Sequence, residues 1–339
     1  MMMKKTILKT LTLGLLVTTT ILGGCGKTSS NENRQSTADN KVIKIGISQI
    51  IEHESLDSAR KGFVDALADN GFKDGEKIEI DFQNAQGDMA IAQTIAQNFV
   101  SQKKDLILAI ATPSAQAAYN LTKDIPILVT AVTDPVKAGI VNSLEKSGTN
   151  VAGTTDAAPI DKQFELLKKL IPTAKKVGIM YNTSEINSES DIEQAKKIAP
   201  KYGLEIITTG ISSVNDISQT LEALIPKIDV LYAPTDNMIA SSMPLISTKC
   251  TEKKIPIIGA VTGEVEGGAL ATEGIDYYKL GYQTGEVAIE IINGKKPQDM
   301  PITTLKDTEL VINADSAKKL NINIPEDLMK KATIIGGGK

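Results

Sequence analysis

Hydroxyl side chains open one predicted helix in the first half of the chain. Thr112, Pro113 and Ser114 directly follow an apolar stretch that predicts a strand, and they precede a stretch with helical spacing, residues 114–123. Free backbone N–H groups and hydroxyls at a helix N-terminus make a ready site for an anion. We therefore expect this turn to suit a carboxylate group.

Acidic and amide side chains take the corresponding places in the second half. Asn182 and Glu185 follow one predicted strand, and Asp236 follows another. These groups suit an ammonium, and a hydrogen bond to a charged group contributes roughly 1.5–3 kcal/mol. Together the two halves would hold a zwitterion such as an amino acid, with micromolar or tighter affinity.

Most candidate ligand-binding residues lie just beyond the carboxyl end of a predicted strand, where open α/β sheets bind their ligands. They are Gln49, Glu54, Thr112, Ser114, Thr133, Asp134, Asn182, Glu185, Asp236 and Asn237. Several also have a purely structural interpretation. Residues 112–114 and 236–237 can be helix caps alone, and Asp134 can belong to a turn. We interpret His53, which stands between two glutamates, as part of a solvated loop.

The sequence offers little support for catalysis or for a cofactor. His53 is the only histidine, so no His-rich metal site can form, and neither CxxC nor GxSxG occurs. The glycine-rich residues 263–268 lack the strand–loop–helix context of a phosphate cradle, and we predict a flexible loop there. We expect no enzyme activity, no metal and no cofactor.

Apolar, β-branched stretches alternate with amphipathic stretches of helix length, the pattern of parallel sheets covered by helices on both faces. The predicted strands are residues 44–50, 77–84, 105–111, 126–132 and 150–155, then 176–181, 205–210, 230–233, 256–260 and 269–273. The predicted helices are residues 55–70, 89–101 and 114–123, then 161–171, 190–202, 216–227 and 243–253. The fold class is therefore α/β.

The two halves correspond in the order of their strand ends, which indicates a duplication into two doubly wound, Rossmann-like lobes. The tail adds a helix at 277–293, extended pieces at 302–305 and 310–313, and a helix at 325–331. We predict that residues 42–156 with 277–305 form lobe one, and residues 157–276 with 306–335 form lobe two. Two or three crossing segments would then make a hinge.

The N-terminus has the pattern of an export signal. Lys4, Lys5 and Lys9 precede an apolar run, residues 11–22, which is shorter than the roughly 20 residues that span a bilayer. The run ends Leu-Gly-Gly before Cys25, and this resembles the bacterial lipobox. We predict a signal peptide at 1–24, a lipid on Cys25, and a flexible polar tether over 25–41.

The overall composition excludes some partners. The net charge is −4, and Arg34 and Arg60 are the only arginines, so we expect no nucleic-acid binding. Nearly 300 residues beyond the tether suffice for two cores of ordinary size. The second cysteine, Cys250, is expected to be an inert buried thiol in a helix.

In combination, several segments of the body resemble the solute-binding lipoproteins of bacterial ABC importers, in the family with tryptophan- and tyrosine-binding members. These segments are residues 46–49, 52–54, 57–63, 111–117, 130–135, 153–156, 181–188, 234–237 and 263–268. The resemblance implies a periplasmic-binding-protein-like fold that closes on its ligand. It also implies ligand contacts at Gln49, Thr112, Ser114, Thr133, Asp134, Asn182, Glu185, Ser188, Asp236 and Asn237.

The resemblance further implies an amino-acid ligand, of the aromatic class (tyrosine, phenylalanine or tryptophan), and an ABC permease in the same membrane as partner. The protein would be a monomer on the extracytoplasmic face of the cell membrane, held there through its lipid only. Two alternatives stay open. One is a surface adhesin or sensor lipoprotein, and the other is a sugar or nucleoside receptor, because a fold does not fix its ligand.

Overall fold

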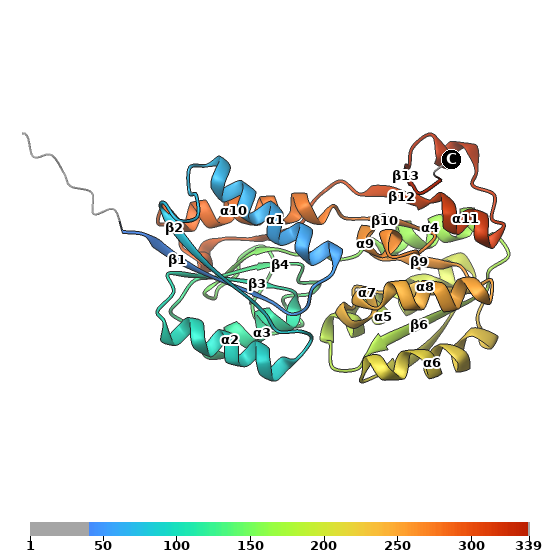
Figure 1. The fold of residues 1–339 in the computed structure, drawn as a ribbon, viewed down its shortest axis with the longest axis horizontal. Helices are drawn as coiled ribbons and strands as arrows, with labels where there is room; N and C mark the ends of the chain where they lie inside the picture. Colours follow the sequence, from blue (N-terminus) through green and yellow to red (C-terminus); the bar gives the residue numbers. More distant parts are fainter. Residues whose placement is uncertain (1–40, 338–339) are drawn as a thin grey trace, which may run out of the picture. The chain divides into compact units, whose positions relative to one another are not determined.

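Two β-sheets organise residues 41–337, the part of the chain that the computed structural model describes (Figure 1). The predicted signal peptide, Cys25 and all but the last residue of the predicted tether lie outside these residues. Sheet one has the strand order β2-β1-β3-β4-β5-β11. Sheet two has the order β7-β6-β8-β9-β10-β12-β13. We call the sheets with their covering helices lobe one and lobe two.

Lobe one is built from residues 43–154 and a returning segment. Its strands are β1 (Ile43–Gln49), β2 (Ile78–Asn84), β3 (Leu106–Ile110), β4 (Ile127–Thr130), β5 (Val151–Thr154) and β11 (Ile302–Thr303). Its helices are α1 (Glu54–Asp69), α2 (Met89–Ser101), α3 (Thr112–Leu121) and α10 (Tyr277–Ile292). Every residue of β3 and β4 is buried, as in parallel strands covered on both faces.

Lobe two holds the remaining elements. Its strands are β6 (Lys176–Asn182), β7 (Glu205–Ile211), β8 (Val230–Ala233), β9 (Ile257–Gly259), β10 (Ala271–Gly274), β12 (Glu309–Asn313) and β13 (Thr333–Ile335). Its helices are α4 (Ile160–Leu170), α5 (Ile186–Ile198), α6 (Ile217–Leu224), α7 (Asn237–Ser241), α8 (Met243–Glu252), α9 (Thr262–Glu266), α11 (Ala314–Leu320) and α12 (Glu326–Met329). Short 3-10 turns follow α5 and flank α6.

The two lobes repeat one topology. The order β2-β1-β3-β4-β5 in sheet one matches β7-β6-β8-β9-β10 in sheet two, and all pairs within these two sets are parallel. The sequence correspondence between the halves predicts this repeat. The fold is the two-lobed, doubly wound α/β architecture that the strand and helix pattern indicates.

The chain passes between the sheets at three places, in residues 155–159, 275–276 and 304–308. After the second crossing, α10 returns to lobe one and packs on α1, with α2 and α3 on the opposite face of sheet one (Figure 1). The helix backbones approach closely at two glycines. A Cβ atom on Gly281 would lie 1.8 Å from the carbonyl oxygen of Ala59, and one on Gly62 would lie 2.0 Å from that of Tyr278.

Several predicted boundaries are wrong, for local reasons. The predicted loop at 263–268 begins with helix α9, because Glu264 folds back onto the backbone N–H of Val261 and so caps the helix. The strand predicted at 126–132 ends at Thr130, because Ala131 has a positive φ of 56°. The helix predicted at 190–202 begins earlier, at Ile186, and its last turn is a 3-10 helix. Helix α11 and strand β13 were not predicted.

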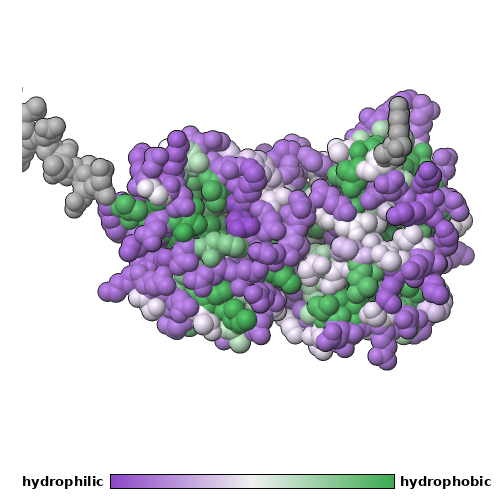
Figure 2. Space-filling model, in the orientation of Figure 1, coloured by the Kyte–Doolittle hydropathy of each residue, from purple (hydrophilic) through white to green (hydrophobic). Residues whose placement is uncertain are grey.

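The face of residues 41–337 drawn in Figure 2 is largely hydrophilic, with separate apolar patches on both lobes. The large apolar side chains that are exposed are scattered over the structure; Val42, Ile91 and Leu245 are examples.

Arg60 stacks on Phe82, 3.9 Å from the ring centre, and pairs with Asp57 at 3.2 Å. Among the described residues, no helix has the length and apolar character needed to cross a membrane.

Candidate ligand-binding site

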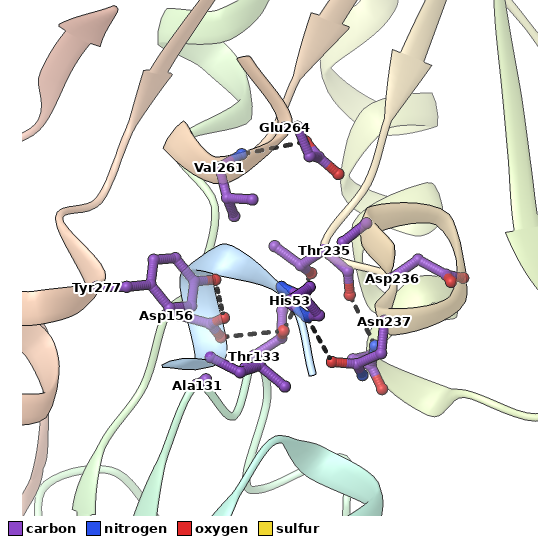
Figure 3. A pocket seen from close by; sticks show the side chains of 13 residues that line it. His53, Ala131, Thr133, Asp156, Thr235, Asp236, Asn237, Val261, Glu264 and Tyr277 are labelled. Carbon is purple, nitrogen blue, oxygen red and sulfur yellow. Dashed lines mark hydrogen bonds between the residues drawn. The ribbon is translucent and has the colours of Figure 1, made fainter. Parts of the chain in front are cut away.

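A polar pocket lies between the lobes at the carboxyl ends of the strands (Figure 3). Figure 3 shows Asp156 and Tyr277 on one side, Asp236 and Asn237 on the other, and His53 between them. The lining residues come from both lobes: His53, Leu56, Ala131, Thr133, Asp156, Asn187, Thr235, Asp236, Asn237, Ala240, Val261, Glu264 and Tyr277. This is where ligands bind in α/β sheets of this kind.

Two contacts join the lobes across the pocket. The hydroxyls of Thr133 and Thr235 lie 3.1 Å apart. The Nε2 atom of His53 lies 3.4 Å from Oδ1 of Asn237. Because Nδ2 of Asn237 donates to Glu185, Oδ1 is the acceptor and His53 donates. The structure therefore shows the lobes in contact around the pocket.

Asp236 organises the lobe-two wall. Its Oδ2 accepts hydrogen bonds from the backbone N–H of Asn182 at 2.6 Å and from the hydroxyl of Ser188 at 2.7 Å. Its Oδ1 accepts from the backbone N–H of Ile239 at 3.0 Å, which caps helix α7. Burial and the nearby Glu185 carboxylate raise the pKa of Asp236 to about 7. Asp236 thus lines the pocket while its oxygens are engaged by the protein.

Glu185 is the second centre of this wall. Its Oε1 accepts from Nδ2 of Asn182 at 3.1 Å, and its Oε2 accepts from Nδ2 of Asn187 at 2.9 Å. Oε2 also accepts from the backbone N–H and from Nδ2 of Asn237, at 3.2 and 2.5 Å. Glu185 does not line the pocket itself. It fixes the amide groups of the residues that do.

The lobe-one wall carries a second buried acid. Asp156 accepts hydrogen bonds from the Tyr277 hydroxyl and, at 3.1 Å, from the Thr133 hydroxyl. Burial raises the pKa of Asp156, and the two hydrogen bonds oppose that shift. Tyr277 begins α10, so the segment that returns from lobe two completes this wall.

Glu264 and Asp191 complete the acidic surroundings. Oε2 of Glu264 accepts from the backbone N–H groups of Ala260 at 2.7 Å and Val261 at 3.3 Å. Oδ2 of Asp191 accepts from the backbone N–H and hydroxyl of Thr235 at 2.8 and 2.7 Å. Burial raises the pKa of Asp191 to about 6 and raises that of Glu264 well above its usual range.

The residues predicted from the sequence separate into four groups. Thr133, Asp236 and Asn237 line the pocket, whereas Asn182, Glu185 and Ser188 hold those side chains in place. Gln49 is buried and donates to Asp57 at 2.9 Å, Asp134 accepts from the backbone of Lys137 in a turn, and Glu54 lines a separate cavity. Thr112 and Ser114 are buried, and their hydroxyls have no hydrogen-bond partner among the described residues.

Strained backbone marks the lobe-one strand ends. Ala111, at the end of β3, has φ 76°, and Ala131, at the end of the neighbouring β4, has φ 56°. An alanine in the left-handed region costs of order 1 kcal/mol or more, and such strain clusters at functional sites. Ala131 lines the pocket, and Ala111 is the N-cap of α3, the helix that Thr112 begins.

Sequence reasoning missed several lining residues, of which Asp156, Asn187, Thr235, Glu264 and Tyr277 are polar. His53, which we interpreted from the sequence as part of a solvated loop, also lines the pocket. Asp156 and Tyr277 each follow the end of a predicted strand region, so the rule that singled out Asp134 could have found them. Glu264 was placed in a flexible loop. Asn187 lies in the first turn of α5, which was predicted to begin later.

His53 is half-buried, and desolvation lowers its pKa to about 4, opposed by the hydrogen bond to Asn237 and by Asp57. The unfolded chain, with a pKa near 6.5, binds the proton more tightly, so stability falls as the pH drops from about 6.5 to 4. In the wild type we expect the free energy of unfolding to fall by up to about 3 kcal/mol from pH 6.5 to pH 4 because of His53. The substitution His53→Gln should remove this contribution. Urea unfolding at a series of pH values, wild type beside variant, measures it.

The comparison of the two proteins at each pH separates His53 from the buried acids, which titrate in both. If the wild type and His53→Gln differ in free energy of unfolding by the same amount at pH 7 and at pH 4, a neutral, half-buried His53 is contradicted.

Two doubly wound lobes with a polar pocket between their strand ends define a bilobed ligand-binding protein. The chain belongs to the family described as ABC transporter substrate binding protein, whose profile matches residues 44–335. It is therefore an ABC-type substrate-binding protein, and its relatives in this family are binding proteins and not enzymes.

The chain is similar to a named relative and to two solved structures. The "Tyrosine-binding protein" of Clostridioides difficile (strain R20291) is 54% identical over 326 residues, 95% of this chain and 94% of its own. A solved ABC domain from Streptococcus pneumonia in complex with L-Trp is 39% identical, with a TM-score of 0.84. The ligand-free, open structure of a substrate binding protein with adhesive properties from Clostridium difficile is 55% identical, with a TM-score of 0.67. Both structures cover 87% of this chain and 99% of their own.

The open structure shares more sequence with this chain than the L-Trp complex does, but it superposes less well on this chain. In this chain the lobes touch around the pocket, between Thr133 and Thr235 and between His53 and Asn237.

Proposed function

We propose that the protein binds an amino acid, of the aromatic class, in the pocket between its lobes and delivers it to an ABC importer. The observation that carries this is a pocket closed by contacts between the lobes and lined by buried acids, with no lysine or arginine in its lining. A cationic group of the ligand would complement that wall. The relatives named for tyrosine and solved with L-Trp support the amino-acid class.

The opposite end of the ligand would face lobe one. The buried hydroxyls of Thr112 and Ser114 stand in the first turn of α3, a helix of 10 residues, where free backbone N–H groups favour an anion. These groups supply donors for a carboxylate without an arginine. The side chain of the ligand would contact the apolar part of the lining, Leu56, Ala131, Ala240 and Val261, to which an aromatic ring is suited.

Structures with sugar-type ligands among the neighbours do not favour the alternative receptor classes. The structure with bound myo-inositol is 22% identical to this chain, and the one with D-arabinose is 16% identical. At that level the similarity establishes the shared fold and leaves the ligand open. The amino-acid proposal rests on relatives of much higher identity.

The test of the proposal is a ligand panel on the purified body, residues 26–339. We expect L-tyrosine, L-phenylalanine or L-tryptophan to raise the melting temperature, because a ligand at a hundred times its Kd adds about 2.7 kcal/mol to the stability. Sugars and nucleosides should leave it unchanged. Differential scanning fluorimetry followed by calorimetric titration makes the measurement, and a panel without any response to amino acids would contradict the proposal.

We also propose the cellular arrangement in which this binding operates. Residues 1–24 would be removed as a signal peptide, and a lipid on Cys25 with a polar tether would hold the body on the outer face of the cell membrane. Lobe one would comprise residues 42–156 and 277–305, and lobe two residues 157–276 and 306–335. The crossings at 155–159, 275–276 and 304–308 would act as the hinge.

A further inference from the structure

Two acceptor oxygens of pocket-lining residues have no hydrogen-bond partner among the described residues. They are Oε1 of Glu264, a residue 1% exposed, and Oδ1 of Asn187, a residue 3% exposed. Buried acceptors are almost always paired, and leaving one unpaired costs about 1–3 kcal/mol. These two oxygens therefore require a donor that the protein itself does not supply.

The identity of both atoms as acceptors follows from their other contacts. Nδ2 of Asn187 donates to Oε2 of Glu185 at 2.9 Å and to the carbonyl oxygen of Thr235 at 2.7 Å, so Oδ1 is the remaining oxygen. Oε2 of Glu264 is fixed by the backbone N–H groups of Ala260 and Val261. A protonated Oε1 would instead be a donor without an acceptor, so the atom lacks a partner in either state.

None of the other acids of this region combines an unpaired acceptor oxygen with a place in the pocket lining. Both oxygens of Asp236 and both oxygens of Glu185 accept hydrogen bonds from protein donors, and so do both of Asp156. Asp191 has one unpaired oxygen, but it does not line the pocket. None of the ion pairs among residues 41–337 involves Asp156, Glu185, Asp191, Asp236 or Glu264.

We propose that Glu264 and Asn187 form the subsite for the ligand's ammonium group, and that the protein selects ligands that carry a primary amine. This inference rests on the proposed amino-acid function and assigns its recognition step. An ammonium has three N–H donors and one positive charge, which match two unpaired acceptors in an acidic wall without a cation. It replaces the sequence-based assignment of this role to Asp236, Glu185 and Asn182.

The subsite couples ligand binding to proton release. Burial, together with Asp191 and Asp236, raises the pKa of Glu264. A bound ammonium favours the ionised carboxylate and so lowers that pKa, and a proton held on Glu264 in the free protein would leave on binding. The titratable groups around the subsite are Asp156 after β5, Asp191 on α5, Asp236 before α7, His53 before α1 and Tyr277 on α10. Affinity should therefore rise with pH through the range in which Glu264 ionises.

The experiment compares three probes on the wild-type body by calorimetric titration: L-tyrosine, tyramine and 3-(4-hydroxyphenyl)propionate. Tyramine keeps the amine and lacks the carboxylate, whereas the propionate keeps the carboxylate and lacks the amine. We expect measurable tyramine binding and at least a hundredfold loss of affinity for the propionate. L-tryptophan, tryptamine and 3-(indol-3-yl)propionate serve as the parallel set if tryptophan is the preferred ligand.

The variant Glu264→Gln places an amide at the subsite and should raise the Kd of the amino acid about ten- to a hundredfold. Glu266→Gln is the matched control, because Glu266 is exposed on the same helix two residues away, and it should leave the Kd unchanged. Melting temperatures without ligand check that both variants fold. Titrations in two buffers of different ionisation enthalpy should show proton release for wild type and a smaller release for Glu264→Gln.

The outcomes separate this inference from the proposed function. Amino-acid binding that survives Glu264→Gln unchanged, or equal affinity for the amine-free probe, overturns the ammonium subsite while the receptor proposal stands. Absence of binding by any amino acid to the wild-type body overturns the proposed function itself. If Glu264→Gln fails to fold, the wild-type probe series and its proton release decide the question alone.

Discussion

Asp236→Ala is expected to lower the free energy of unfolding by about 3 kcal/mol and to abolish amino-acid binding. The carboxylate accepts from the backbone of Asn182, the hydroxyl of Ser188 and the backbone of Ile239. Truncation leaves three buried donors unpaired, each at a cost of about 1–3 kcal/mol. The variant no longer carries the cost of burying the carboxyl group, which offsets part of this loss. One of these three bonds, from the backbone N–H of Ile239, is the N-cap of α7, a contact worth typically about 1 kcal/mol.

The measurement is urea unfolding without ligand, followed by titration of the variant at a temperature where it stays folded. Asp236→Asn should lose less stability than Asp236→Ala, because the amide oxygen still accepts one or two of the three bonds. Asp134→Ala is the matched control. Asp134 also follows a strand of the repeat, but it accepts only from the backbone of Lys137 and lies outside the pocket lining.

The two roles of Asp236 predict different results. An organising role lowers stability in the free protein and removes binding as a consequence. A role as a simple ligand contact would lower affinity and leave the stability of the free protein unchanged, and that outcome would contradict the organising role. Ligand titrations of the variant apply to both roles, because they measure the affinity of the protein that is still folded.

The sequence predicts the layout of the fold because its signals are local and repeated. The apolar runs that became β3 and β4 are bounded by turn residues, and the strand ends of the two halves follow one order. The helix and strand boundaries that were predicted wrongly depend on side-chain contacts and backbone angles that the local sequence pattern does not show. The fold-back of Glu264 turns a glycine-rich stretch into α9, and the positive φ of Ala131 ends β4 early.

The candidate site was predicted only in part, because closure and the returning segment decide which strand ends meet. The rule that reads residues just after strands reaches Thr133, Asp236 and Asn237, which line the pocket. It does not reveal that Asp236 is saturated by protein donors while Glu264 is not. That difference depends on the hydrogen bonds that residues 182 and 188 donate to Asp236, and those residues lie 54 and 48 positions away from it in the sequence.

The anchor proposal predicts the other large effect. Cys25→Ala should remove nearly all of the protein's lipid labelling and shift nearly all of the mature body from the membrane fraction to the soluble fraction or the medium. Each buried CH₂ of an acyl chain contributes about 0.8 kcal/mol, so two or more chains on one cysteine give stable anchoring.

The design must separate lipid loss from failed signal cleavage. Metabolic labelling with a fatty acid reports the lipid, and the mass of the mature chain reports cleavage before residue 25. Cys250→Ala is the matched control, since that thiol is buried in α8 and should leave labelling and membrane retention unchanged. Labelling of Cys25→Ala at the wild-type level would exclude Cys25 as the anchor. If the tethered body delivers its ligand to an ABC permease in the same membrane, as we propose, the released variant should still bind the amino acid but support little uptake.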